Sequence, residues 1–159
     1  MKIKTSFVAG IAIAACAATA VFSGGHADKA AKAAVKARQA TMTLYAFELG
    51  ALGAMAKGDV EYNADAATAA AANLAKVTSM NQARLWLPGT STAELGDATG
   101  ALPALWESGS KAADIGKELA MAAVAMEAAA GEGLDSLRGA IGAVGKTCGA
   151  CHDDYRKSQ

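Results

Sequence analysis

The residues with the clearest chemical potential are Cys148, Cys151 and His152, which stand close together near the end of the sequence. Two thiols with this spacing can each form a thioether with one vinyl group of the same porphyrin, and an adjacent imidazole can then bind the iron. A neutral histidine ring nitrogen is a strong axial ligand. The segment Cys-Gly-Ala-Cys-His therefore predicts one haem c, attached covalently through Cys148 and Cys151, with His152 as the metal ligand.

The same two cysteines admit other chemistry. A Cys-x-x-Cys pair also occurs as a redox-active dithiol, as a structural disulfide and as half of a zinc site. Zinc normally takes four protein ligands, and the sequence has no second cluster of cysteine or histidine. A redox pair is expected beside a strand–helix unit, and no strand pattern surrounds residues 148–151. A thiol–disulfide enzyme is kept as an alternative hypothesis.

The bulk composition favours helices and excludes one class of partner. The chain has 159 residues, 53% of them hydrophobic, and most of these are alanine, whereas aromatic residues make up 5%. Alanine is the best helix former and a poor strand residue, so an all-α domain is expected. The 15 basic residues are balanced by 15 acidic residues. Nothing in this balance indicates a nucleic-acid partner.

The first residues have the pattern of a secretory signal peptide. Lys2 and Lys4 precede an apolar run over residues 7–22, and Gly25 and Ala27 are small residues at the positions that a signal peptidase inspects. We therefore predict a signal peptide over residues 1–27 and export to the periplasm.

Cleavage after Ala27 leaves a single domain over residues 28–159 and removes Cys16 and His26. His152 is then the only histidine, which excludes ligation of the iron by two histidines. Lipoprotein processing at Cys16 is the less favoured alternative, because the apolar run continues well beyond that residue.

Apolar residues recur at helical spacing in four segments, which are residues 28–57, 63–84, 103–130 and 134–155. Asn63 is the expected N-cap of the second helix, and Pro103 suits the first turn of the third. Residues 85–102 contain one proline and three glycines and are expected to form a loop. Short links with one longer crossover predict an antiparallel, up-down-up-down four-helix bundle that encloses the covalently bound haem c near one end.

The first helix carries polar residues on or beside its apolar stripe. Arg38 interrupts the stripe, where a charge is costly unless it is paired, and haem brings two propionates that a guanidinium can bind. An arginine that reaches solvent is the alternative. Gln39 can add an amide donor. Met42, one turn later, is either plain core packing or a thioether close to the open iron position.

The last helix places its cysteines on the apolar seam with Leu137, Val144 and Tyr155. Arg156 follows His152 by one turn and is either near the proximal imidazole or a solvated terminal residue.

With these residues in place, the chain resembles the cytochrome c′ family, the class II c-type cytochromes, a group with this bundle architecture. The match covers nearly the whole of residues 28–159 and rests on several motifs in the same order, namely Arg38-Gln39-x-x-Met42, Ala56-Lys57-Gly58, Pro88-Gly89-Thr90, Leu102-Pro103-x-Leu105-Trp106 and Cys148-Gly-Ala-Cys151-His152-Asp-Asp-Tyr155-Arg156.

The resemblance implies roles for further residues. Arg38 and Gln39 match the propionate-side pair, Met42 matches the distal residue that crowds the sixth iron position, and Arg156 matches the proximal arginine. Thr99 is the candidate for a polar contact from the crossover. The family implies a mostly five-coordinate haem that binds nitric oxide or carbon monoxide, and it also includes low-spin members with a methionine sixth ligand. Homodimers through the first two helices are common in it.

Two functions are therefore expected alongside the thiol–disulfide alternative. The first is a periplasmic, non-enzymatic carrier of single electrons, which exchanges them with small redox proteins or membrane electron-transfer complexes. The second is a module that scavenges or senses nitric oxide. A low-spin carrier with Met42 as the sixth ligand is a variant of the first.

Overall fold

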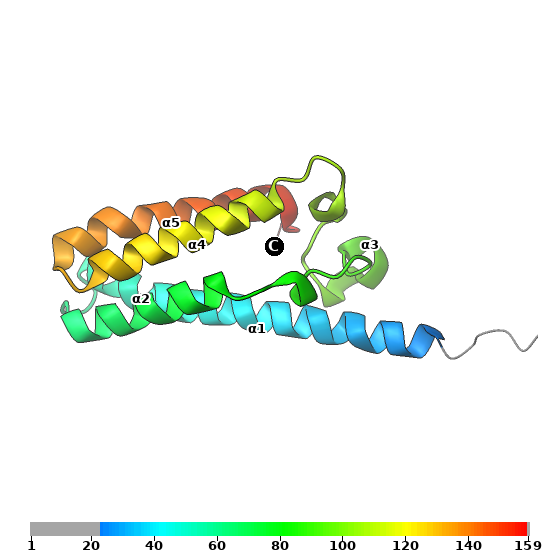
Figure 1. Cartoon of the computed structure of the whole chain (residues 1–159), viewed down its shortest axis with the longest axis horizontal. Coiled ribbons are helices and arrows are strands. Elements are labelled where there is room, and N and C mark those ends of the chain that lie inside the picture. The colour runs from blue at the N-terminus through cyan, green and yellow to red at the C-terminus, as the bar shows by residue number, and fades with distance from the viewer. Residues whose placement is uncertain (1–22, 159) are drawn as a thin grey trace, which may run out of the picture.

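The computed structural model describes residues 23–158, and four long helices hold most of them. These are α1 (Ser23–Lys57), α2 (Ala64–Ser79), α4 (Ala112–Ala130) and α5 (Leu134–Tyr155). In Figure 1 the α1–α2 hairpin lies beside the α4–α5 hairpin. Helix α4 packs against α2 and α5, and α1 packs against the same two helices. The antiparallel four-helix bundle predicted from the sequence is confirmed.

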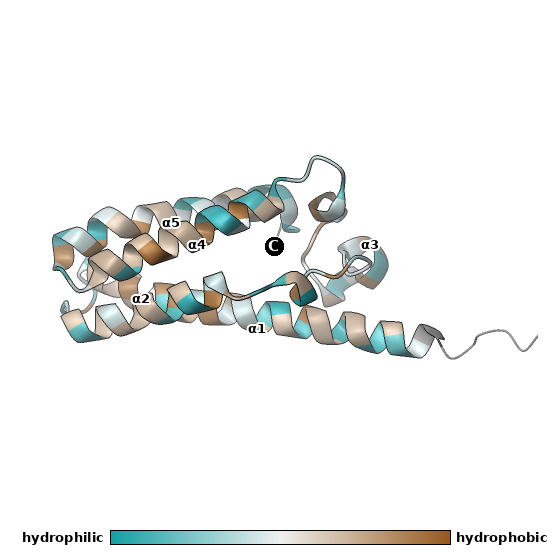
Figure 2. Cartoon of the chain, viewed as in Figure 1, coloured by the Kyte–Doolittle hydropathy of each residue, from teal (hydrophilic) through white to brown (hydrophobic). Residues whose placement is uncertain are grey.

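The core lies between the four helices and is formed by side chains spaced three or four residues apart along each helix. Its fully buried side chains include Leu52, Met126, Leu137 and Val144. Each contributes about 1.5–3 kcal/mol through its removal from water. Alanines on α2 and α4 are also fully buried, which allows these helices to approach closely. Figure 2 shows the resulting alternation of hydrophobic and hydrophilic residues along each long helix.

The turns at one end of the bundle are held by side-chain caps. The side chain of Asn63 accepts a hydrogen bond of 2.9 Å from the backbone of Ala66, which confirms it as the N-cap of α2. Tyr62 joins the two turns, because its hydroxyl donates to the carbonyl of Ala130 at 2.9 Å and accepts from the amide of Gly133 at 3.1 Å. The crossover and the C-terminus lie at the opposite end of the bundle.

The second helix is shorter than the sequence predicts. It ends at Ser79 and not near Arg84. The side chain of Asn81 accepts a hydrogen bond from the amide of Ala83 at 3.0 Å, a local alternative to helical bonding, and a short 3-10 helix follows over Ala83–Leu85. The crossover also contains a four-residue helix, α3 (Thr92–Leu95), where the sequence predicts only a loop.

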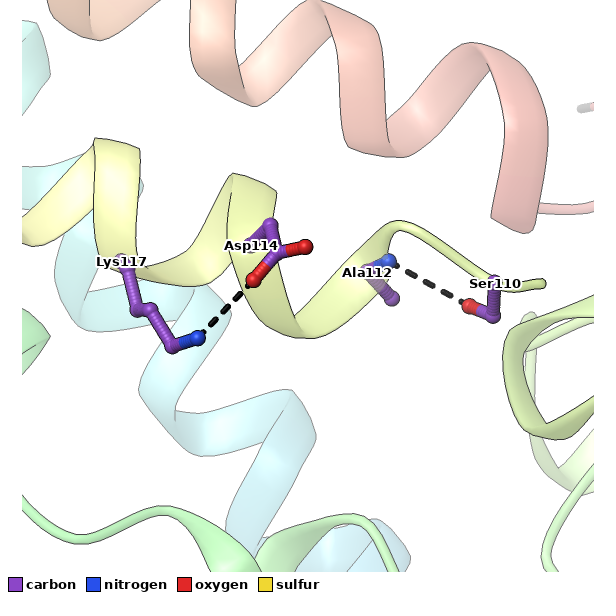
Figure 3. A network of polar contacts seen from close by, with 4 residues as sticks. All are labelled: Ser110, Ala112, Asp114 and Lys117. Carbon is purple, nitrogen blue, oxygen red and sulfur yellow. Dashed lines mark hydrogen bonds and ion pairs between the residues drawn. The ribbon is translucent and has the colours of Figure 1, made fainter. Parts of the chain in front are cut away.

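The third long helix does not begin at Pro103, and the prediction from the sequence is wrong at this point. Residues Pro103–Trp106 form a separate 3-10 helix, and α4 begins only at Ala112. Gly109 between them has a φ of 96°, a conformation that favours glycine and cannot continue a helix. Figure 3 shows how α4 then begins, with Ser110 accepting from the amide of Ala112 at 3.3 Å and Lys117 paired with Asp114 at 2.8 Å.

The C-terminus returns to the crossover. Ala101 and Arg156 form an isolated antiparallel bridge, and the amide of Leu102 donates to the carbonyl of Tyr155 at 2.9 Å. Figure 1 places the C-terminus between the two hairpins at the crossover end. Both the haem motif and the crossover therefore lie at the same end of the bundle.

Most of the predicted signal peptide, residues 1–22, lies outside the described residues, and Ser23–Ala27 form the first residues of α1. No helix among residues 23–158 has the length and apolar character needed to cross a membrane.

Candidate haem site

Cys148, Cys151 and His152 lie on the last two turns of α5, and all three side chains are half-buried. Cys148 packs against the core, so the helix turns the first thiol inward as its place on the apolar seam predicts. The helix stops just after the motif, where the amide of Arg156 donates to the carbonyl of His152 at 3.2 Å.

Burial controls the electrostatics of these groups. Burial raises the pKa of both cysteine thiols, and for Cys151 the charges of Cys148 and Asp154 raise it further. The pKa of His152 is lowered, first by burial and then by the nearby Arg156. A neutral imidazole is the form that binds a metal, so His152 is ready to act as a ligand at neutral pH.

The thiol pKa values give a test of the thiol–disulfide alternative. We expect iodoacetamide to alkylate the haem-free chain with a midpoint above the ordinary thiol pKa of 9.0, because burial disfavours the thiolate that reacts. The rate is measured against pH, with the same chain in urea as the control. A midpoint near neutral pH, as in dithiol enzymes, would contradict this expectation and revive the alternative.

Arg38 is the buried charge of the site, with 4% of its surface exposed. Its Nη1 donates to the carbonyl of Leu85 and to Oγ1 of Thr90, both at 3.2 Å. Its Nη2 donates to the carbonyl of Thr90 at 3.2 Å and to Oγ1 of Thr99 at 2.7 Å. None of the ion pairs formed within residues 23–158 involves Arg38, so the acceptors found for this buried cation are neutral oxygens.

Two tryptophans from the crossover enclose the guanidinium of Arg38. Its central carbon lies 4.8 Å from the ring centroid of Trp86 and 5.9 Å from that of Trp106. The indole N–H of Trp106 donates to the carbonyl of Trp86 at 3.1 Å, which holds the two residues together. A cation at this distance from an indole face is attracted to it. The spacing of the two tryptophans in the sequence does not reveal that they share one arginine.

The other predicted site residues are distributed around this centre. Gln39 is exposed and donates to the carbonyl of Ala98 at 3.1 Å, and Met42 is half-buried against the core. Thr99 is buried and contacts Arg38. Arg156 has an exposed side chain, and its backbone pairs with Ala101.

Sequence reasoning missed the roles of two residues of this region. Thr90 is fully buried and anchors Arg38, although the sequence gives it only as part of a turn motif. Tyr45 is buried on α1, and its hydroxyl accepts a hydrogen bond from the side-chain amide of Gln82 at 2.6 Å. Burial is the largest cause that raises the pKa of Tyr45, and the charge of the neighbouring Cys148 adds to it. A buried tyrosine hydroxyl needs a partner, and this requirement was the available signal.

A Cys-x-x-Cys-His segment in a four-helix bundle, at the same end as a buried arginine and two tryptophans, is typical of the class of bundle-type haem c proteins. A family model described as Cytochrome C′ matches residues 33–156. The chain therefore belongs to the cytochrome c′ family, whose members are haem proteins that bind haem c. This confirms the resemblance seen in the sequence and the expected cofactor.

Named relatives agree with this assignment. A cytochrome c-554 from Cereibacter sphaeroides is 42% identical over 77% of this chain and 92% of its own length. A cytochrome c′ from the same species is 41% identical over 77% of this chain and 81% of its own length. The chain is thus about equally similar to relatives that carry two different names.

Solved structures also superpose on the chain. A cytochrome c′ from Rhodobacter spheriodes has a TM-score of 0.77 and 40% identity, covering 81% of this chain and 98% of the other. A nitric oxide complex of a mutant cytochrome c prime from Alcaligenes xylosoxidans has a TM-score of 0.70 and 32% identity, covering 81% and 97%. A carbon monoxide-bound variant of that protein has a TM-score of 0.68 and 32% identity, covering 79% and 94%.

Proposed function

We propose that Cys148 and Cys151 hold one haem c, that His152 is its axial ligand, and that the protein carries single electrons in the periplasm. The observation that carries this proposal is the place of the three residues. They are half-buried on the last two turns of α5, at the bundle end where the crossover surrounds Arg38.

When bound, haem c supplies an iron that changes by one electron and that can take a gas molecule at an open axial position. The chain's own residues fix the rest of the site. Burial and Arg156 favour the neutral imidazole of His152, and the half-buried position of Cys148 keeps its sulfur on the core side of α5.

The buried charge of Arg38 supports its assignment to the propionate side. An arginine keeps its positive charge in proteins, and a buried charge without a carboxylate partner is costly. Both Nη groups donate to the crossover, so a propionate would meet Arg38 through the remaining Nε–H and through charge. Gln39 is the proposed second donor to the propionates. Thr99 takes part on this side through its hydrogen bond with Arg38.

Met42 is proposed to face the distal side of the haem, where it either crowds the sixth position or, in the low-spin variant, fills it. We predict that Met42→Ala keeps its haem and loses about 1–3 kcal/mol of stability through the space left in the core. Haem content is measured by absorbance, with Met55→Ala, a buried methionine on the same helix, as the matched control. Loss of haem in the Met42 variant alone would contradict this account.

Electron transfer is tested by a potentiometric titration of the haem-containing protein. A reversible one-electron iron couple is expected, and a protein without such a couple would exclude the carrier function. None of the described residues is proposed here to act as a catalytic acid or base, and we propose a carrier of electrons and not an enzyme. We propose small redox proteins or membrane electron-transfer complexes as its partners.

Gas binding is the second candidate function. Two similar solved structures carry nitric oxide and carbon monoxide, and this chain has a single histidine after Ala27. We propose that the reduced protein binds the same gases if the sixth position is open. Nitric oxide added to the reduced protein should change its spectrum, and a six-coordinate spectrum that ignores the gas would exclude this function.

We also propose that residues 1–27 are removed on export, so that the mature chain begins at Asp28 within α1. N-terminal sequencing of the exported protein tests this. A mature chain that begins with a modified Cys16 would favour the lipoprotein alternative.

A homodimer through α1 and α2 is proposed on the basis of apolar exposure. Leu44 and Phe47 on α1 are 49% and 71% exposed, and Met80 at the end of α2 is 42% exposed. We expect Phe47→Glu to convert a dimer into a monomer in sedimentation analysis, while Val124→Glu on α4, where the residue is also exposed, leaves the dimer unchanged. A monomeric wild-type protein would contradict the dimer.

A further inference from the structure

Hydrogen bonds and one backbone pairing connect Arg38 on α1 to the end of α5. This path begins at Thr99, whose Oγ1 accepts from Nη2 of Arg38 at 2.7 Å and from the amide of Ala101 at 3.2 Å. Ala101 pairs with Arg156, whose amide donates to the carbonyl of His152 at 3.2 Å. One hydroxyl therefore joins the two parts of the candidate site.

Two backbone hydrogen bonds flank the pairing of Ala101 with Arg156. The amide of Leu102 donates to Tyr155 at 2.9 Å, and the amide of Lys157 donates to Gly100 at 2.8 Å. An exposed ion pair of 2.8 Å between Lys157 and Asp97 lies beside it. These bonds fix the last turn of α5 against the crossover, so any change in the crossover backbone at residues 99–102 reaches the C-terminal tail.

Thr99 occupies the only point of this path that depends on a side-chain acceptor. Its side chain is 5% exposed, and its hydroxyl serves two donors that are themselves buried. If that acceptor is removed, the amide of Ala101 and one N–H of Arg38 lose a partner away from water. Unsatisfied buried donors of this kind are costly, so the crossover must move to satisfy them.

We propose that Thr99 is a positioning residue that couples Arg38 to the turn carrying His152, and so sets the placement of the axial imidazole. This rests on the proposed ligand role of His152. The haem-side charge and the proximal helix end are then held by one residue, although Arg38 and His152 lie on different helices. Thr99 acts through its neighbours and contacts no iron ligand directly.

The experiment compares the haem-containing wild type with Thr99→Val, which keeps the shape of the side chain and removes the acceptor. Thr99→Ser retains the hydroxyl as the rescue variant, and Thr99→Cys serves if the valine variant does not fold. Thr78→Val is the matched control, because Thr78 is 6% exposed and its hydroxyl bonds only carbonyls of its own helix. Hydrogen exchange and the reduction potential of the iron are measured for each.

In Thr99→Val we expect the amides of Ala101, Leu102 and Lys157 to exchange at least tenfold faster, and the reduction potential to shift, with both effects reversed in Thr99→Ser. Thr78→Val should change neither. If Thr99→Val has the same exchange rate at Lys157 and the same reduction potential as Thr78→Val, the proposal is overturned and Thr99 is a purely structural residue. A wild type without haem would instead refute the proposed function, and the exchange rates would still decide whether Thr99 couples the tail to the crossover.

Discussion

Arg38→Leu is expected to lower the free energy of unfolding by about 3 kcal/mol, the largest stability loss of any single polar change in the site. The substitution removes the donor that Arg38 supplies to the carbonyls of Leu85 and Thr90 and to the hydroxyl of Thr90. The hydroxyl of Thr99 keeps only the amide of Ala101 as a donor. It also removes the cation between Trp86 and Trp106. Relief from burying a charge offsets part of the loss, which is why the figure is not larger.

Urea unfolding of the purified haem-containing protein measures this loss. Arg84→Leu is the matched control, since Arg84 is an exposed arginine of the same crossover and should stay within about 0.5 kcal/mol of the wild type. Arg38→Lys, which keeps the charge with a different donor geometry, should fall between the two. An Arg38→Leu protein as stable as the Arg84 variant would contradict the structural role assigned to Arg38.

Replacement of both Cys148 and Cys151 by alanine is expected to abolish covalent haem retention completely. Thioether formation with haem requires a cysteine thiol, and the cysteines within residues 23–158 are Cys148 and Cys151. Each substitution removes one half-buried sulfur, so the bundle should remain folded at a cost of about 1 kcal/mol per site.

A haem-dependent stain of the denatured protein on a gel measures retention, and circular dichroism reports the helices. Ala150→Ser, an exposed position between the cysteines, is the control and should retain the full haem signal. Haem that stays with the denatured double variant would show that another attachment point exists.

The sequence predicts the elements whose signals are local. Cys148 and Cys151 were placed on the inner side of the last helix because helical spacing repeats within a few residues, and the structure has Cys148 against the core. Asn63 was placed as an N-cap by the same kind of local argument. The start of the third helix was misplaced because Pro103 fits the first turn of either helix type, and the left-handed Gly109 that separates them carries a weak signal.

The partners of Arg38 could not be derived from the sequence. Thr90 and Thr99 lie 52 and 61 residues away along the chain, and their approach depends on the path of the whole crossover. The sequence indicated that a buried arginine needs acceptors, but it suggested only haem propionates. The structure adds the neutral oxygens of the crossover, which the periodicity of the helices does not specify.

The intact mass of the exported, purified chain tests the central claim most directly. We predict a mass above that of the polypeptide by one haem, with the increment located on the peptide that contains Cys148 and Cys151. A colourless protein whose mass is that of its amino acids alone would contradict it.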